Sequence, residues 1–238
     1  MTSQTDSAAT DSGDHSIAVQ SHSLGFRWQQ RQRALSFPDV TLNQGEHLFI
    51  HGASGTGKST LLSLLAGMLQ PASGQVRLLG TDLNPLSAGA RDRFRADYIG
   101  VIFQQFNLVP YLSALANVTL PCQLSMPRRA AAEPDPEQEA QHLLTALAIP
   151  DDHWHQKPGR LSIGQQQRVA AARALIGAPR LILADEPTSA LDTGNRDRFL
   201  ELLLTLAHRR NTSVLFVSHD PSLARHFHQQ IELEGPAT

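Results

Sequence analysis

From residue 17 onward, short apolar runs alternate with helical spacings of leucine along the chain. Four apolar runs near the N-terminus predict strands, at residues 17–19, 24–28, 40–42 and 47–50. A glycine-rich segment, 52–57, follows the fourth run, and the leucines after it recur on one face of a helix predicted over 59–69. A strand, a glycine loop and a helix in this order form one unit of a parallel α/β sheet.

The rest of the chain continues this alternation. Further strands are predicted at 75–79, 98–103, 181–184 and 214–217, and helices at 113–124, 139–148, 162–176, 196–208 and 221–227. Apolar strands separated by helices indicate a parallel sheet that is covered on both faces. Residues 1–16 are polar and lack the basic start of a secretory signal, so they predict a disordered tail. The segment 126–138, rich in Pro, Glu, Arg and Ala, predicts a surface excursion.

Composition narrows the function classes. The 238 residues fit one domain, and 20 Lys and Arg against 22 Asp and Glu give a net charge of −2. The chain therefore offers no basic field, and we expect no nucleic-acid partner. Cys122 is the single cysteine, which excludes an internal disulfide and favours a reducing compartment. The most apolar stretch, 61–69, is far shorter than the roughly 20 residues that cross a bilayer, so we expect a soluble chain.

Residues 52–59, Gly-Ala-Ser-Gly-Thr-Gly-Lys-Ser, fit the phosphate-loop pattern G-x-x-x-x-G-K-[ST] in full. In such a loop the glycines let successive backbone N–H groups point at phosphate oxygens, and the following helix N-terminus adds positive charge. We expect Lys58 to reach the β and γ phosphates and the Ser59 hydroxyl to bind Mg²⁺. The candidate nucleotide-binding residues are Gly52, Ser54, Gly55, Thr56, Gly57, Lys58, Ser59 and Thr60. A glycine-rich turn of purely structural use is the alternative.

Two carboxylates, Asp185 and Glu186, follow the apolar run 181–184. Ligands bind at the carboxyl ends of parallel strands, and an acidic pair there is costly unless a cation or a substrate uses it. We expect Asp185 to hold Mg²⁺ through water, and Glu186 to orient and deprotonate a water that attacks a phosphate ester. A solvated acidic turn is the alternative.

The segment 161–168, Leu-Ser-Ile-Gly-Gln-Gln-Gln-Arg, opens a predicted helix. Ser162 and Gln165 form a capping-box pattern, which by itself indicates only a well-capped helix. Ser162 also lies 24 residues before Glu186, however. With its motifs in this order, the sequence from about residue 17 to 232 resembles the nucleotide-binding subunits of ATP-binding cassette (ABC) transporters.

The resemblance implies further site residues. Gln104 matches the Q-loop glutamine, with a catalytic role and a place in the Mg²⁺ shell, and His219 matches the switch histidine. Asp192 closes a D-loop over 189–192. The residues that match the LSGGQ signature, and would bind nucleotide with Asp192, are Ser162, Gly164 and Gln165.

Two further positions concern the adenine contact and the third residue of the signature. Trp28, 24 residues before Gly52, aligns with the family's aromatic residue that stacks on adenine. Phe26 competes for this role, and packing of Trp28 in the core is the alternative. Ile163 stands where the signature usually has glycine, and its branched side chain is accommodated if it points away from the nucleotide. If it does not, close approach of the backbone to phosphate is in doubt.

The resemblance also implies a fold and an activity. The expected α/β fold has a P-loop NTPase core with a mostly parallel sheet, an N-terminal antiparallel β region and an inserted helical subdomain at about 88–178, within one domain of residues 17–238. The expected activity is ATP hydrolysis with ATP and Mg²⁺ as cofactors. It would take place in a homodimer in which the phosphate loop of one chain faces the signature of the other.

The expected partner follows from the same resemblance. Residues 102–118 are similar to the FQ-FNLLP-LTALENV stretch of the lipoprotein-releasing and macrolide-exporting group. This implies a separate integral membrane permease and a peripheral position on the cytoplasmic side of the inner membrane. The apolar residues of 106–112 are then expected to line a groove for a short helix of the permease, with core burial as the alternative for half of them.

Two alternative functions are a soluble ABC ATPase and a regulatory cassette. A soluble ABC ATPase acting on nucleic acid or ribosomes usually carries a long coiled coil or a second cassette, and neither is present. A regulatory cassette that binds ATP without turnover is favoured by Ile163 and opposed by Glu186 and His219. The pairs 153/155 and 226/228 are histidines two residues apart, which do not share a helix face, so no metal site is expected from them.

Overall fold

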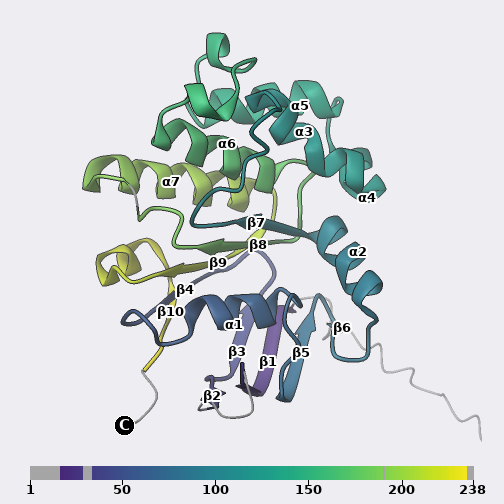
Figure 1. The fold of residues 1–238 in the computed structure, drawn as a ribbon, viewed down its shortest axis with the longest axis vertical. Helices are drawn as coiled ribbons and strands as arrows, with labels where there is room; N and C mark the ends of the chain where they lie inside the picture. The colour runs from purple at the N-terminus through teal and green to yellow at the C-terminus, as the bar shows by residue number, and fades with distance from the viewer. Residues whose placement is uncertain (1–16, 29–33, 190, 235–238) are drawn as a thin grey trace, which may run out of the picture.

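The computed structural model describes residues 17–28, 34–189 and 191–234, which form two β-sheets and the helices that cover them (Figure 1). The predicted tail, 1–16, lies outside the described residues. The strands are β1 (Ile17–Phe26), β2 (Leu35–Ser36), β3 (Val40–Asn43), β4 (His47–His51), β5 (Ser73–Leu78), β6 (Thr81–Asp82), β7 (Ile99–Ile102), β8 (Leu181–Asp185), β9 (Ser213–Ser218) and β10 (Gln229–Glu232). The α-helices are α1 (Lys58–Leu65), α2 (Ala88–Tyr98), α3 (Ala114–Leu124), α4 (Met126–Ala131), α5 (Pro136–Ala146), α6 (Ile163–Leu175) and α7 (Thr193–Arg209), and 3-10 helices lie at Asp151–His153, Pro158–Arg160 and Pro221–His226.

A parallel sheet in the order β10-β4-β9-β8-β7 forms the centre of the molecule. Each neighbouring pair in it is parallel. Strand β9 is buried along its whole length and β8 up to Ala184, as expected for strands covered on both faces. Because the strands run in the same direction, the residues that follow β4, β7, β8 and β9 reach one edge of the sheet.

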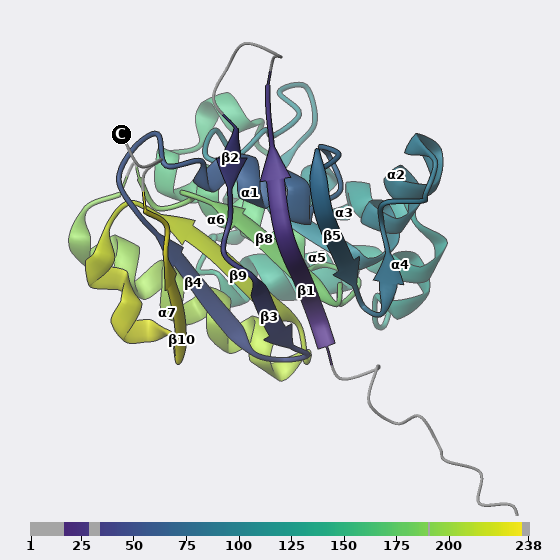
Figure 2. The same ribbon diagram turned by 90° about the horizontal axis from the view of Figure 1, so that it is seen from below.

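Helix α1 lies between the parallel sheet and an antiparallel one (Figure 2). In the antiparallel sheet β1 is central, with β3, β2 and β5 as its partners and β6 beside β5. One apolar core joins the two sheets through α1, since Leu61 and Leu65 share it with Val19 of β1 and Leu183 of β8. The core therefore fixes the helix that follows the glycine loop from both sides.

Helices α3, α5, α6 and α7 cover the other face of the parallel sheet (Figure 1). A second core there contains Val118 of α3, Leu144 of α5, Val169 of α6, Leu203 of α7 and Phe216 of β9. Alternate residues of the same strands thus enter different cores, as Leu215 belongs to the first core and Phe216 to the second. The α/β fold with an N-terminal antiparallel region, expected from the sequence, is confirmed.

Several predicted elements differ from the structure where the hydrophobic period was weak or absent. The run 17–19 and residues 24–26 of the run 24–28 belong to one strand, β1, which shifts register between His22 and Gly25, whereas residues 27 and 28 follow the strand. Helix α2 was not predicted because none of its residues is buried, so it carries no apolar stripe. Strand β10 was missed because it is polar, and 221–227 forms a 3-10 helix and not an α-helix.

The segment 126–138 is not a simple surface excursion. It contains α4, and the side chain of Arg128 on that helix is buried. Its guanidinium donates to the carbonyl oxygens of Ala174 at 2.8 Å and Ile176 at 3.0 Å, at the C-terminal end of α6. Burial lowers the pKa of Arg128 to about 10. A charged residue is buried here because unpaired helix carbonyls accept its hydrogen bonds, a tertiary match that the sequence does not display.

Within 88–178, the segment expected to form the helical subdomain, strand β7 pairs with β8 in the parallel sheet. Gly100 of β7 allows a close approach to α6, because a Cβ there would lie 2.3 Å from the carbonyl oxygen of Ala174. Across the described ranges, no helix combines the length and apolar character needed to cross a membrane.

Candidate functional site

The glycine loop connects the end of β4 to the start of α1. Gly57, the N-cap of α1, has a φ of 95° and Gly55 a φ of 84°, conformations that favour glycine. Helix α1 therefore begins at Lys58, and its N-terminus lies at the carboxyl edge of the parallel sheet. This is the arrangement in which free backbone N–H groups and the helix dipole attract an anion.

Lys58 is buried and folds back over the loop. Its Nζ donates to the carbonyl oxygens of Gly52 and Ala53, both at 2.9 Å, and lies 3.7 Å from Oε1 of Glu186. The ammonium group is thus held between the loop and the acidic end of β8. A phosphate on the loop would accept these hydrogen bonds in place of the two carbonyl oxygens.

Ser59 at the start of α1 contacts Asp185 at the end of β8, with Ser59 Oγ donating to Asp185 Oδ1 at 3.1 Å. Burial raises the pKa of the Asp185 carboxyl, and the hydrogen bond from Ser59 opposes this shift only in part. Over the described residues there is no group of three His, Cys, Asp or Glu side chains that would hold a metal. The Ser59 and Asp185 oxygens are hard donors of the kind that Mg²⁺ accepts, and Mg²⁺ is commonly bound through one or two protein ligands together with phosphate and water.

Glu186 and His219 form a second polar pair at the same edge. Nδ1 of His219, which follows β9, lies 2.8 Å from Oε2 of Glu186. Glu186 has a φ of 44°, and its N–H donates to the carbonyl of Val217 at 2.9 Å. The backbone at the end of β8 is therefore held in a left-handed conformation that turns this carboxylate toward the histidine and the loop.

Lys58, Ser59 and Glu186 line one cleft of about 520 Å³, and Asp185 and His219 adjoin it through their contacts with Ser59 and Glu186. Gly52 and Thr56 of the glycine loop are not part of its lining. The lining consists of Trp28, Leu35, Ser54, Gly55, Gly57, Lys58, Ser59, Thr60, Gln104 and Glu186. Trp28 is 59% exposed and meets the buried Phe26 edge to face at 5.1 Å between ring centroids. The geometry favours Trp28 over Phe26 as the aromatic wall of the cleft. Leu35 was not predicted, because a single leucine in a short polar segment gives no signal in the sequence.

The predicted signature residues lie elsewhere in the chain and do not line this cleft. Ser162 caps α6, and its capping box with Gln165 is present, with hydrogen bonds of 3.2 and 2.8 Å. Ile163 is 55% exposed, so its branched side chain is accommodated outside the core. A Cβ on Gly164 would lie 3.6 Å from Leu191, which places the signature beside the D-loop.

Asp192 caps α7 by accepting from the backbone N–H of Asn195 at 3.1 Å. This hydrogen bond, with a further one from the Asn195 side chain, lowers the pKa of Asp192. Asp192 is likewise absent from the lining of the cleft. Ala190, within the predicted D-loop, lies outside the described residues.

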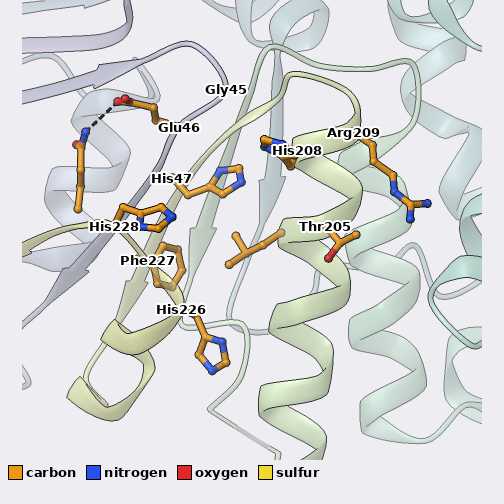
Figure 3. Close-up of a pocket in the computed structure, with 11 residues that line it drawn as sticks. Gly45, Glu46, His47, Thr205, His208, Arg209, His226, Phe227 and His228 are labelled. Carbon is orange, nitrogen blue, oxygen red and sulfur yellow. Dashed lines mark hydrogen bonds between the residues drawn. The ribbon is translucent and has the colours of Figure 1, made fainter.

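A larger cavity, about 620 Å³, lies at the opposite edge of the sheet, between the start of β4 and the end of α7 (Figure 3). We refer to it as the histidine cavity, because its lining includes His47, His208, His226 and His228. Burial lowers the pKa of His47, and His208 and His228 add smaller effects in the same direction. Its single carboxylate, Glu46, accepts a hydrogen bond from Gln229 at 2.8 Å. The cavity has no glycine loop and no paired carboxylates.

Comparison with known proteins identifies the family of the chain. The ABC transporter family matches residues 35–189. The chain is 41% identical over 195 residues to the lipoprotein-releasing system ATP-binding protein LolD of Hydrogenovibrio crunogenus, covering 82% of this chain and 83% of the relative. It is also 41% identical over 195 residues to the macrolide export ATP-binding/permease protein MacB of Pectobacterium atrosepticum, but spans only 29% of that protein.

Solved structures give the same assignment. The ATP-binding cassette MJ0796, determined as a dimer in a post-hydrolysis state with ADP and Pi, superposes with a TM-score of 0.80 at 36% identity. The match covers 91% of this chain and 94% of that one. The chain therefore belongs to the ABC transporter family, as an ATP-hydrolysing nucleotide-binding subunit of the group that includes LolD and MacB.

Proposed function

We propose that the cleft binds Mg²⁺-ATP, with Lys58 on the phosphates, Trp28 against the adenine and Glu186 as the catalytic base. The observation that carries this proposal is the convergence of Lys58, Asp185, Glu186 and His219 at the glycine loop. In it, His219 fixes the Glu186 carboxylate, which orients and deprotonates the attacking water. The positive charge of Lys58 and the loop N–H groups stabilise the charge that spreads over the transferred phosphoryl oxygens.

Ser59, Asp185 and Gln104 are proposed to hold Mg²⁺. The ion supplies charge neutralisation on the β and γ phosphate oxygens when it is bound. Ser59 and Asp185 already share a hydrogen bond, and Gln104 lines the same cleft two residues beyond β7. The raised pKa of Asp185 supports this assignment, because a buried carboxylate with so little compensation gains most from a nearby cation.

We further propose that two copies of the chain enclose two ATP molecules. Ser162, Gly164, Gln165 and Asp192 do not line the cleft of their own chain. The dimeric structures of the similar cassette MJ0796 support a role for these residues in completing the cleft of a second copy. The Ser162 hydroxyl and the Gly164 N–H at the start of α6 then face the partner's phosphates.

The membrane partner is proposed to dock where apolar side chains are exposed. Of the 106–112 segment, Phe106 is buried and Leu108 packs on the core, whereas Tyr111 is 74% exposed. Leu124 and Met126, at the junction of α3 and α4, are 72% and 76% exposed. These residues support docking of a permease helix on this side, at the cytoplasmic face of the inner membrane and in a system of the lipoprotein-release or macrolide-export type.

Glu186→Gln tests the catalytic proposal, because it keeps the shape and hydrogen bonding of the side chain but removes the base. The variant should bind Mg²⁺-ATP, lose turnover by about 100-fold or more and accumulate a dimer that light scattering detects. Hydrolysis at the wild-type rate would remove Glu186 from the catalytic role. Tyr111→Glu tests docking separately, since it should preserve ATPase activity of the isolated chain and abolish stimulation by the membrane subunit.

A further inference from the structure

A network of charged side chains connects the first turn of α7 to the residues that follow His219. Arg196, on α7, pairs with Asp220 and donates to Ser222 Oγ at 3.2 Å. The Arg196 side chain is only 13% exposed. Asp220 is 31% exposed, so the pair is partly shielded from solvent, and loss of Asp220 leaves the nearly buried Arg196 charge without this partner.

Asp220 has two functions at once in this arrangement. Besides pairing with Arg196, its carboxylate accepts from the N–H of Ser222 at 2.9 Å and caps the 3-10 helix Pro221–His226. Its own N–H donates to Ser218 Oγ at 3.1 Å. The hydrogen bonds from Ser222 and the charge of Arg196 lower the pKa of Asp220, so it is ionised at neutral pH. The short segment 218–222, which carries His219, is thereby attached to α7.

The Arg196–Asp220 pair connects the proposed catalytic residues with the segment beside the signature. At one end, His219 is next to Asp220 and lies 2.8 Å from Glu186 through its Nδ1. At the other end, the N–H of Arg196 donates to the carbonyl of Asp192 at 2.9 Å, in the turn that begins α7. The preceding residue, Leu191, lies beside Gly164 of the signature.

We propose that Arg196 is a positioning residue that acts through Asp220 to hold His219 against Glu186. It also makes the position of His219 depend on the start of α7, and hence on the segment next to the signature. This inference rests on the proposed roles of Glu186 and His219. It assigns to Arg196 an effect on turnover and not on nucleotide binding, because the side-chain partners of Arg196 are Asp220, Ser222 and Asp197, none of which belongs to the glycine loop.

The test measures kcat and KM for Mg²⁺-ATP in Arg196→Met, Asp220→Asn and the double variant. Methionine keeps an apolar stem, and asparagine keeps the cap on Ser222, so each removes mainly the ion pair. Each single variant should lose about tenfold in kcat, with KM changed by less than about twofold, since a displaced catalytic group costs turnover. The double variant should be no slower than either single one, because both remove the same interaction.

Two further variants separate positioning from general stability. Arg196→Lys keeps a charged donor for Asp220 and should recover most of the lost kcat. Arg225→Met is the matched control: Arg225 pairs at 2.6 Å with Asp197, which also lies 3.7 Å from Arg196 Nε, but Arg225 is more exposed and has no ion pair with Asp220, so its kcat should equal that of the wild type. Unfolding midpoints are recorded for every variant, and Asp220→Asn decides the question if Arg196→Met does not fold.

The inference is overturned if Asp220→Asn keeps wild-type kcat, if the two single losses multiply in the double variant, or if Arg225→Met loses as much as Arg196→Met. Failure of the proposed function gives a different result. In that case the wild type would not hydrolyse Mg²⁺-ATP, or Glu186→Gln would hydrolyse it at the wild-type rate.

Discussion

The ATP cleft and the histidine cavity lie at opposite ends of the same strand, β4. The histidine cavity is the larger, at about 620 Å³ against about 520 Å³, and it contains four ionisable histidines. At the start of β4, however, burial lowers the pKa of His47, and the one carboxylate already has a hydrogen-bond partner. At its end, the N-terminus of α1 meets two carboxylates: Ser59 donates to Asp185 at 3.1 Å, and the Lys58 ammonium group lies 3.7 Å from Glu186, which is also 2.8 Å from His219.

The volume of a cavity therefore does not identify the functional site in this molecule. Parallel strands bring their following loops to the carboxyl edge, so side chains distant in sequence gather there, with α1 directing its N–H groups at them. The amino edge near His47 instead meets the C-terminal end of α7, where the free groups are carbonyl oxygens. The negative end of the helix dipole disfavours an anion such as ATP there, and Arg209 brings a positive charge to the lining without a converging set of N–H groups. Substitutions in the cleft should therefore change ATP binding or turnover, and substitutions in the histidine cavity should not.

Lys58→Ala should have the largest effect. Mg²⁺-ATP at about 100 times its dissociation constant should stabilise the wild type by about 2.7 kcal/mol, or roughly 5–10 °C in melting temperature, because it binds only the folded state. The variant should lose this shift, since the ammonium group on the phosphates is gone. His208→Ala, in the histidine cavity, is the matched control and should keep it. A full shift in Lys58→Ala, measured by thermal unfolding, would place ATP elsewhere.

Trp28→Ala should have the next largest effect. Stacking of a base on an aromatic ring is worth about 1–3 kcal/mol, so the dissociation constant for Mg²⁺-ATP should rise by roughly fivefold or more. Trp28→Phe should restore most of the affinity, because it keeps an aromatic face. Fluorescence titration measures both. Equal affinity of the alanine variant and the wild type would exclude Trp28 from the adenine site.

Asp185→Asn should raise the melting temperature of the ligand-free protein but reduce the gain in melting temperature that Mg²⁺-ATP produces. The folded-state pKa of Asp185 is raised, so its ionised form costs stability at all pH values above that pKa, and the cost is relieved as pH falls through it toward 3.8. Without Mg²⁺ and nucleotide, the variant should therefore melt higher than the wild type at pH 7, with a smaller gain near pH 4. With Mg²⁺-ATP it should gain less than the wild type. A lower melting temperature at pH 7 without ligand contradicts the first expectation.

His47→Gln should have the smallest effect, and only on stability. The folded-state pKa of His47 is lowered below 6.5, so the neutral side chain contributes stability that is fully present above pH 6.5 and is lost as pH falls toward the folded-state pKa. The variant should therefore lose less stability than the wild type between pH 7 and 5, in chemical unfolding measured at each pH. The variant should hydrolyse ATP at the wild-type rate. A loss of ATPase activity in His47→Gln would connect the two regions.

The chemistry of the proposed ATP site could be predicted from the sequence. The pattern at 52–59 requires glycine at position 57, where the backbone adopts a left-handed φ, and it places Lys58 and Ser59 at the start of a helix. Asp185 and Glu186 come directly at the end of a continuous apolar strand, which already indicates an edge of a buried sheet. These signals are local, because a phosphate loop and a strand end are each encoded by a few consecutive residues.

Two features could be identified only from the tertiary structure. They are the elements without a hydrophobic period and the charged side chains that are buried. Helix α2 and strand β10 have no apolar stripe to detect, and Arg128 is buried because carbonyls from a distant helix end receive it. Arg196 and Asp220 are 24 residues apart and match no motif, yet they form an ion pair beside His219. Such contacts depend on how α7 and β9 pack together, and the free energy of a pairing between distant residues leaves no trace in either local sequence.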